Sequence, residues 1–411
     1  MPAENLRQAL NILDPERALR TADEIDDYFV EREQSPLVEL KILLTDIESP
    51  QKVLFSGHRG SGKSTELGKL SLDLADEFYI VHYSIKSILN LFDLTYVDVL
   101  LSLGLELFRR ATADRLGIKE SVFQNVLDFQ KEITKEVEMG VSAQPGVQAE
   151  LNLYVVKLSS KLGAEARTRE IIREKVSPRL SDLLENIDFV AREVERVTRK
   201  RLLFIVEDLD KTDLAKSKSL FYDYASSLLA PAVSIIYTFP IALRHDNAFI
   251  QIENYFINSY VLPNIKTCHR NGIEDPQGRS CLQDILTLRV ADSLFEAGVL
   301  SQLAQYSGGI PRELISLARL ACLEALKTKA SIIIPASVDR AILRKRMDYQ
   351  VLLSQEQLQL LAKIYQTKKV DNDEPFRQLL HNLSALEYRN DIGVWYDVHP
   401  LVAALLPEAP L

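Results

Sequence analysis

The chain has 411 residues, of which 46% are hydrophobic and 26% charged, a balance that is ordinary for a folded protein with a buried core. Its net charge of −9 argues against adhesion of the whole protein to nucleic acid or to an anionic membrane, although a local basic patch could still bind either. Three cysteines without disulfide-like or zinc-like spacing, an N-terminus interrupted by charges and the lack of long apolar runs predict a cytoplasmic protein without membrane contact.

Taken in chain order, the pattern begins with helical residues 3–31 and continues with an apolar helical stripe over 37–44. A short apolar run at 53–55 precedes a glycine-rich loop, a helical pattern follows the loop, and residues 79–83 have the composition of a strand. Strand, loop, helix and strand in this order indicate a βαβ unit of a parallel sheet.

A long interruption follows, because residues 86–198 are mostly helical in pattern and exceed a normal crossover. Its centre, residues 136–160, alternates apolar and polar residues around Pro145-Gly146 and predicts a two-stranded protrusion. An insertion of this size usually carries a partner contact or forms a subdomain.

The sheet resumes after the insertion. Apolar runs at 202–206, 233–237 and 259–262 predict three more strands, the first of them buried on both faces. Residues 281–330 are helical in pattern, and the last seventy residues combine helices with a hairpin over 385–399 that turns at 390–393. No internal repeat is found, which argues against a solenoid.

The glycine-rich loop matches the phosphate-binding pattern G-x-x-x-x-G-K-[ST]. Glycines allow backbone N–H groups to point inward, and the helix that follows offers unpaired N–H groups and a positive dipole end. We expect Lys63 to reach the β- and γ-phosphates of a nucleotide and Ser64 to ligate Mg²⁺. The other residues expected in this cradle are Gly57, His58, Arg59, Gly60, Ser61, Gly62 and Thr65.

A nucleotide loop needs a second acidic site that holds Mg²⁺ and polarises water, and the end of a neighbouring buried strand is the natural place. The run L-L-F-I-V-E-D-L-D-K supplies Glu207, Asp208 and Asp210 after five apolar residues. Two assignments stay open: Glu207 organises the metal and Asp208 the water, or the roles shift by one position. An aspartate at the water position favours slow hydrolysis, because the shorter carboxylate reaches less well.

With both motifs present, the chain resembles the AAA+ and STAND branch of P-loop ATPases over residues 28–411, apart from the insertion. The resemblance implies an α/β fold in which a P-loop NTPase parallel sheet is flanked by helices and followed by a helical lid and a C-terminal winged-helix domain. The implied divisions are an N-terminal helical segment at 1–35, the NTPase core at 36–265 with its helical and hairpin insertion at 86–198, the lid at 266–335 and the winged helix at 336–411.

The resemblance also implies roles for residues outside the two motifs. Val30 belongs to F-V-E-R-E, which is similar to the family's V-G-R-E box near the adenine but has Glu31 in place of glycine. Thr238 ends a strand at the family's sensor-1 position, close to the γ-phosphate. Pro311 matches the G-x-P box that packs on the base, and Arg312 stands at the sensor-2 position facing the phosphates.

Three further residues are candidates on the same resemblance. His399 is similar to the M-H-D histidine that contacts the β-phosphate of ADP, although Val398 and Pro400 depart from that motif and a structural histidine is an equal alternative. Arg244 and Arg270 are candidates for an arginine that a neighbouring subunit would supply.

The leading hypothesis is an ATP-binding, slowly hydrolysing regulatory ATPase that uses ATP/ADP and Mg²⁺ and acts as a conformational switch, for example in prokaryotic defence or signalling. It implies a protein partner, a sensor or effector on a separate chain, and is compatible with a homo-oligomer. The alternative is a DNA-binding AAA+ ATPase of the origin-recognition or transposition-regulator type. DNA is less favoured because residues 376–396 offer only Arg377 and Arg389, offset by Glu387 and Asp391. The third hypothesis is a scaffold that binds nucleotide without hydrolysing it.

Overall fold

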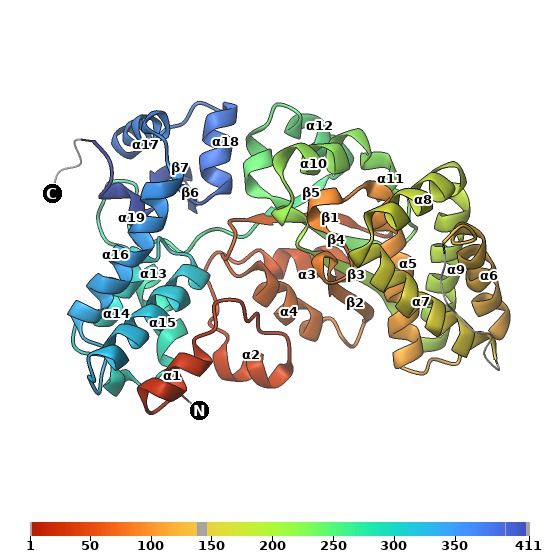
Figure 1. The fold of residues 1–411 in the computed structure, drawn as a ribbon, viewed down its shortest axis with the longest axis horizontal. Coiled ribbons are helices and arrows are strands. Elements are labelled where there is room, and N and C mark those ends of the chain that lie inside the picture. Colours follow the sequence, from red (N-terminus) through yellow and green to blue (C-terminus); the bar gives the residue numbers. More distant parts are fainter. Residues whose placement is uncertain (1, 138–145, 391, 408–411) are drawn as a thin grey trace.

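The computed structural model describes residues 2–137, 146–390 and 392–407. Figure 1 shows a central sheet, a group of insertion helices at one end of the molecule, and lid and C-terminal helices at the other. No helix in the described part of the chain has both the length and the apolar character needed to cross a bilayer.

The central sheet has five parallel strands in the order β2-β3-β4-β1-β5. The strands are β1 (Lys52–Gly57), β2 (Phe78–Ser84), β3 (Arg201–Glu207), β4 (Ser234–Pro240) and β5 (Asn258–Val261). All five strands that the sequence predicts for the parallel sheet are therefore present. Because all five run in one direction, the loops after β1 and β3 leave the sheet at the same edge, with β4 between them.

Strand β3 shows why the sheet is covered on both sides. Leu203 and Ile205 pack with residues of the helices α3 (Leu37–Asp46) and α4 (Lys63–Asp73), whereas Phe204 and Val206 face the opposite layer. Such a strand reads as a continuous apolar run because neither face meets water.

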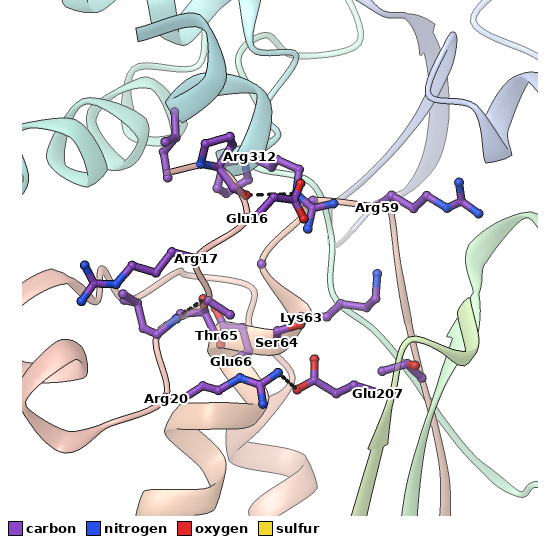
Figure 2. A pocket seen from close by; sticks show the side chains of 18 of the residues that line it. Glu16, Arg17, Arg20, Arg59, Lys63, Ser64, Thr65, Glu66, Glu207 and Arg312 are labelled. Carbon is purple, nitrogen blue, oxygen red and sulfur yellow. Dashed lines mark hydrogen bonds and ion pairs between the residues drawn. The ribbon is translucent and has the colours of Figure 1, made fainter. Parts of the chain in front are cut away.

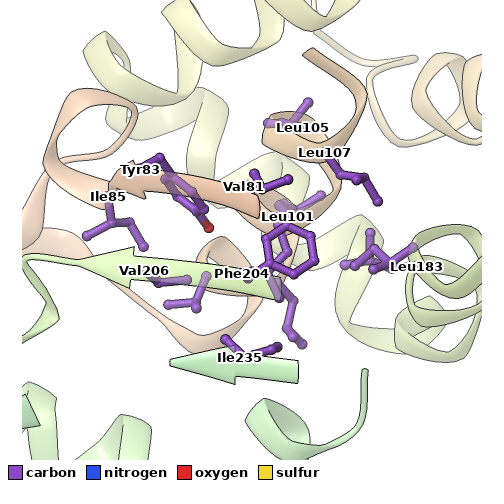
Figure 3. Packing of buried hydrophobic residues seen from close by; sticks show 14 of the residues in the cluster. Val81, Tyr83, Ile85, Leu101, Leu105, Leu107, Leu183, Phe204, Val206 and Ile235 are labelled. Carbon is purple, nitrogen blue, oxygen red and sulfur yellow. The ribbon is translucent and has the colours of Figure 1, made fainter. Parts of the chain in front are cut away.

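The opposite layer is built largely by the insertion. Its helices are α5 (Tyr96–Ala113), α6 (Glu120–Ile133), α7 (Val147–Ala164), α8 (Ala166–Val176) and α9 (Leu180–Thr198). Figure 3 shows Leu101, Leu105 and Leu183 from these helices beside Phe204 of the sheet, all within one buried cluster. The insertion therefore shares the hydrophobic core of the sheet.

The predicted two-stranded protrusion is wrong for residues 147–160, which lie in α7; residues 138–145 are outside the described part of the chain. The apolar residues of α7 that become buried recur at intervals of four, three and four, which is a helical period: Leu151, Val155, Leu158 and Leu162. Apolar and polar residues also alternate over shorter stretches of this segment, and that alternation led to the wrong prediction of strands.

Short helices connect the last strands. They are α10 (Leu214–Lys218) and α11 (Ala225–Leu229) between β3 and β4, and α12 (Phe249–Tyr255) between β4 and β5. A helical lid follows, formed by α13 (Pro276–Thr287), α14 (Val299–Tyr306), α15 (Pro311–Lys327) and α16 (Pro335–Leu352). The N-terminal helix α1 (Leu6–Ile12) packs in the hydrophobic cluster of this lid, and α2 (Ala22–Tyr28) follows it after a connection of residues 13–21.

The C-terminal unit has the helix–helix–hairpin arrangement of a winged helix. It comprises α17 (Gln355–Thr367), α18 (Glu374–His381), the antiparallel pair β6 (Ala385–Asn390) and β7 (Gly393–Val398), and α19 (Pro400–Ala403). The hairpin prediction over 385–399 is confirmed. The domain boundaries inferred from the sequence stay a prediction.

Candidate functional site

The loop between β1 and α4 needs glycine for two physical reasons. Gly60 and Gly62 have φ angles of 79° and 99°, in the left-handed region that favours glycine. A Cβ on Gly60 would also lie 2.7 Å from Cβ of Arg312, and one on Gly62 would lie 2.3 Å from Nη2 of Arg32. The loop is thus bent and closely covered, with the first turn of α4 directly behind it.

Lys63 begins α4 and is held by three oxygens. Its Nζ donates to the backbone oxygens of Gly57 and His58 at 2.9 and 3.0 Å, and lies 2.8 Å from Oδ2 of Asp210. The side chains of Lys63 and Asp210 are only 7% and 4% exposed. This buried pair connects the loop after β1 to the loop after β3.

Glu207 ends β3 and is almost completely buried. His82 of β2 lies with Nε2 2.5 Å from Oε1 of Glu207, and Arg20 donates to the same oxygen at 3.0 Å. Burial raises the pKa of Glu207, but the hydrogen bond and charge of His82 and the charge of Arg20 outweigh it and hold the pKa below its usual value. Glu207 is therefore a carboxylate at neutral pH.

Asp208 follows at a sharp turn, with a φ angle of 71°. Ser84 Oγ donates to its Oδ2 at 2.5 Å, and Lys211 Nζ lies 2.6 Å from its Oδ1. Burial raises the pKa of Asp208, but the hydrogen bonds from Lys211 and Ser84 and the charges of Lys211 and Lys86 outweigh it, so the pKa lies below its usual value. Asp208 is also ionised, and each of its oxygens has a partner.

One cleft brings most of the predicted residues together. It encloses about 1110 Å³, including its solvent-filled mouth, and Figure 2 shows Lys63, Ser64 and Glu207 around it. The predicted residues that line it are Val30, Arg59, Gly60, Gly62, Lys63, Ser64, Thr65, Glu207, Asp208, Thr238, Pro311 and Arg312. Gly57, His58 and Ser61 belong to the loop without being among the lining residues.

Two of the lining residues connect neighbouring elements. Thr238 is 1% exposed; its Oγ1 accepts from the backbone N–H of Leu209 at 3.2 Å and donates to the backbone oxygen of Val206 at 3.4 Å. Thr238 thereby fixes the turn that holds the acids. Arg312 begins the lid helix α15, and its backbone N–H donates to the backbone oxygen of Gly60 at 3.2 Å. The lid therefore touches the phosphate loop itself.

The cleft also has apolar lining residues. Val30 and Pro311 line it together with Tyr28, Ile285 and Ile315, which come from α2, α13 and α15, and Arg289, another lining residue, lies over the ring of Tyr28. A cleft with both apolar and cationic lining has the chemistry that a nucleotide requires, because the base is flat and weakly polar whereas the phosphates are charged.

The buried side of the phosphate loop contacts the winged helix. His58 is 1% exposed, and its Nε2 accepts from the backbone N–H of Glu387 in β6 at 2.8 Å. Arg59 Nη2 lies 2.8 Å from Nε2 of His381 in α18 and donates to the backbone oxygen of Lys211 at 3.0 Å. These contacts place the winged helix directly on the nucleotide loop.

His399 and the two candidate arginines lie elsewhere. His399 does not line the cleft; it is fully buried, its Nδ1 accepts from the N–H of Leu401 at the start of α19, and its ring packs against Tyr349. Arg244 is half-buried and donates to Ser259 Oγ at 2.6 Å, and its expected role toward a neighbouring subunit stays a prediction. Arg270 is exposed.

The residues present fit both a triphosphate and Mg²⁺. Among the residues that the structure describes, no cluster of three or more His, Cys, Asp or Glu side chains could hold a metal by itself. Mg²⁺ is commonly held by one or two carboxylates, a hydroxyl and phosphate oxygens, with water completing the octahedron. Ser64 and Glu207 both line the cleft and would supply the protein part of such a set.

Sequence reasoning missed the site contacts of three residues. Asp210 was named in the acidic run, but its pairing with Lys63 depends on the strand order. His82 stands two residues before the end of β2, and its contact with the end of β3 exists only because the two strands pair. Arg20 had no signal, because it reaches the cleft from a segment 187 residues away from Glu207.

No family model matches the sequence, and no curated protein matches it. Among solved structures, Cdc6p from Pyrobaculum aerophilum is 12% identical, with 95% of this chain and 94% of that chain covered and a TM-score of 0.43. The Aeropyrum pernix ORC1 protein in complex with DNA is 13% identical (97% and 98% covered, TM-score 0.44), and a Walker-type ATPase of Pyrococcus abyssi is 16% identical (96% and 99% covered, TM-score 0.44). Identities and TM-scores this low do not assign a family or a function.

Proposed function

We propose that this chain is an AAA+-type P-loop ATPase that binds ATP in the cleft, hydrolyses it slowly and changes conformation with the nucleotide state. The observation that carries the proposal is that one cleft contains the phosphate-loop residues Lys63 and Ser64, the carboxylates Glu207 and Asp208, and the lid residue Arg312. Backbone amides and Lys63 would hold the phosphates, and Ser64 with Glu207 would hold Mg²⁺. When bound, Mg²⁺ neutralises the charge that develops on the transferred phosphate.

The partners of the two acids favour one of their two open assignments, because both oxygens of Asp208 are engaged, whereas His82 and Arg20 both contact Oε1 of Glu207. Glu207 is then the metal-organising carboxylate and Asp208 the residue that orients water. Asp208 is already hydrogen-bonded at both oxygens, and it has the shorter side chain, which supports a slow reaction. Slow hydrolysis suits a switch, because each nucleotide state then persists long enough to be recognised by a partner on another chain.

The experiment is a nucleotide-binding and phosphate-release assay on the purified full chain. Wild type should bind ATP and ADP with Mg²⁺ and release phosphate slowly; Lys63→Ala should lose binding, and Asp208→Asn should keep binding while losing hydrolysis. Lys69→Ala is the matched control, since Lys69 lies on the same helix α4, pairs with Asp73 and does not line the cleft. If wild type and Lys63→Ala bind nucleotide equally, the proposal fails.

DNA binding is the second candidate function, and the winged helix gives it little support. The two cations expected to face DNA between residues 376 and 396 are engaged within the chain: Arg389 Nε lies 2.6 Å from Oε1 of Glu387, and Arg377 pairs with Asp246 at 3.6 Å. Recognition of duplex DNA needs cations that can face phosphates. A salt-dependent mobility shift with duplex DNA in the presence of ATP would nevertheless reverse the order of the two functions.

A further inference from the structure

Residues 13–21, here called the strap, run along the nucleotide cleft, and residues 15–20 line it. The strap connects α1, which packs on the lid, to α2, which lies beside the core (Figure 1). Residues of the strap line the cleft together with the phosphate loop and the acids. The lid is thus joined to the core twice: through the chain after β5 and through the strap.

Specific contacts hold the strap at its lid end. Arg319 Nη1 donates to the backbone oxygen of Leu13 at 3.0 Å, and Leu13 is fully buried. Arg312 Nε donates to the backbone oxygen of Pro15 at 3.2 Å and lies 3.6 Å from Oε1 of Glu16, as Figure 2 shows. The lid arginine expected to face the phosphates is therefore held by the strap.

At its core end the strap lies directly on α4. Leu19 is 4% exposed, and its N–H donates to Oγ1 of Thr65 at 3.4 Å. Its backbone oxygen comes so close to α4 that a Cβ on Gly68 would lie 2.5 Å away. Thr21 then caps α2 in a reciprocal capping box with Glu24. A glycine within a helix is unfavourable by itself, so its place here fits the need to let the strap pass.

Arg20, between these two anchors, reaches the metal end of the cleft. Its Nη2 donates to Oε1 of Glu207 at 3.0 Å, while its side chain is 44% exposed and Glu207 is 2% exposed (Figure 2). A guanidinium in this position neutralises the carboxylate that, on the function proposed above, would hold Mg²⁺. Arg20 is free to swing into solvent, whereas Glu207 is fixed by burial and by His82.

We propose that the strap is an autoinhibitory latch: Arg20 and Mg²⁺ compete for Glu207, and loading of the magnesium nucleotide releases the strap from the core. Because the same strap holds Arg312, its release also frees the lid arginine to face the phosphates. This inference rests on the proposed ATPase function. The alternative role for Arg20 is to bind a phosphate of the nucleotide. Its replacement would then weaken nucleotide binding, whereas the latch predicts that its replacement lowers the Mg²⁺ concentration needed for binding.

The test compares wild type with Arg20→Gln in titrations of a fluorescent ADP analogue over a range of Mg²⁺ concentrations. The latch predicts that Arg20→Gln reaches half-maximal binding at roughly tenfold less Mg²⁺, the size expected for loss of one charge-assisted hydrogen bond to the carboxylate. Arg20→Lys, which keeps the charge, should stay near wild type. Arg7→Gln, an exposed arginine on α1 outside the cleft, is the matched control.

Hydrogen exchange of the wild-type strap gives a readout that is independent of Arg20 substitution. The amides of residues 13–21, including that of Leu19, should exchange faster in the presence of Mg²⁺ and ADP than in their absence. Unchanged or slower exchange, an unchanged Mg²⁺ requirement, or weaker nucleotide binding by Arg20→Gln would each overturn the latch. If neither wild type nor Arg20→Gln binds nucleotide, the proposed function itself is wrong, and the latch falls with it.

Discussion

Acidification should destabilise the folded chain through two buried histidines. His58 and His399 are 1% and 0% exposed, and each accepts a hydrogen bond from a backbone N–H, His58 from Glu387 and His399 from Leu401. An imidazolium ion has no acceptor nitrogen, so protonation would remove both bonds. Burial is the main cause that lowers the pKa of each histidine from 6.5 to about 4.

The sign of the effect follows from proton uptake. Because the folded pKa lies below the unfolded one, the unfolded chain binds more protons as the pH falls below 6.5, and stability is lost progressively down to about pH 4. Between pH 7 and pH 5 each histidine should cost about 2 kcal/mol, so that the pair costs about 4 kcal/mol. A loss of this size is a large part of the stability of a typical domain.

Urea unfolding at pH 7 and pH 5 measures this loss. The comparison is between wild type and the double variant His58→Gln/His399→Asn, whose amide oxygens can accept the same hydrogen bonds and do not titrate. Burial also raises the pKa of Glu387, but its partners, among them His245 and Arg389, outweigh this and lower it to about 2. The stability lost on protonation of Glu387 is therefore the same in wild type and double variant, and most of it is lost below pH 5. Equal losses of unfolding free energy in wild type and double variant would refute the reasoning.

Gly68→Ala should lower the melting temperature by several degrees, the effect of about 1–3 kcal/mol of overpacking against the strap, whereas Gly104→Ala, where a Cβ would meet only side-chain atoms at 3.4 Å or more, should not. Asp210→Asn should raise the affinity for ADP several-fold in a fluorescence titration, because Lys63 loses the carboxylate that competes with the phosphates; unchanged affinity would contradict this. Trp395, the single tryptophan, is buried in the hairpin that hydrogen-bonds the phosphate loop, so its emission should change as nucleotide binds. A flat signal during a saturating titration would show that the hairpin does not respond.

The sequence predicted those parts of the site that depend on local order. The phosphate loop is one continuous segment whose glycines, lysine and serine need only a preceding strand and a following helix. The acids were predictable because an uninterrupted apolar run such as 202–206 must be a buried strand, and the carboxyl ends of parallel strands meet at one edge. The hairpin over 385–399 was predictable in the same way, because the turn residues 390–393 lie within the same short segment as its two strands.

What the sequence could not show depends on tertiary packing. The contacts of Arg20 with Glu207 and of His58 with Glu387 join residues 187 and 329 positions apart, and none of these residues belongs to a spacing pattern that links it to its partner. The histidine expected near the β-phosphate is a further case. His399 follows a hairpin, but packing buries it between the C-terminal unit and Tyr349 of the lid helix α16, while His58 in the loop itself makes the contact between the phosphate loop and the C-terminal unit.

The pairing of the acids bears on the proposed switch function. Each carboxylate at the metal end has a cation partner from a different element: Glu207 with Arg20 of the strap, Asp208 with Lys211 of its own turn, and Asp210 with Lys63 of the phosphate loop. Phosphates and Mg²⁺ would have to replace at least the first and last of these pairs, so part of the binding free energy would go into rearranging the strap and the loop. A ligand shifts a conformational equilibrium only through such differential contacts. Exchange of these ion pairs on nucleotide binding would therefore couple occupancy to shape, which is the property that the proposed switch requires.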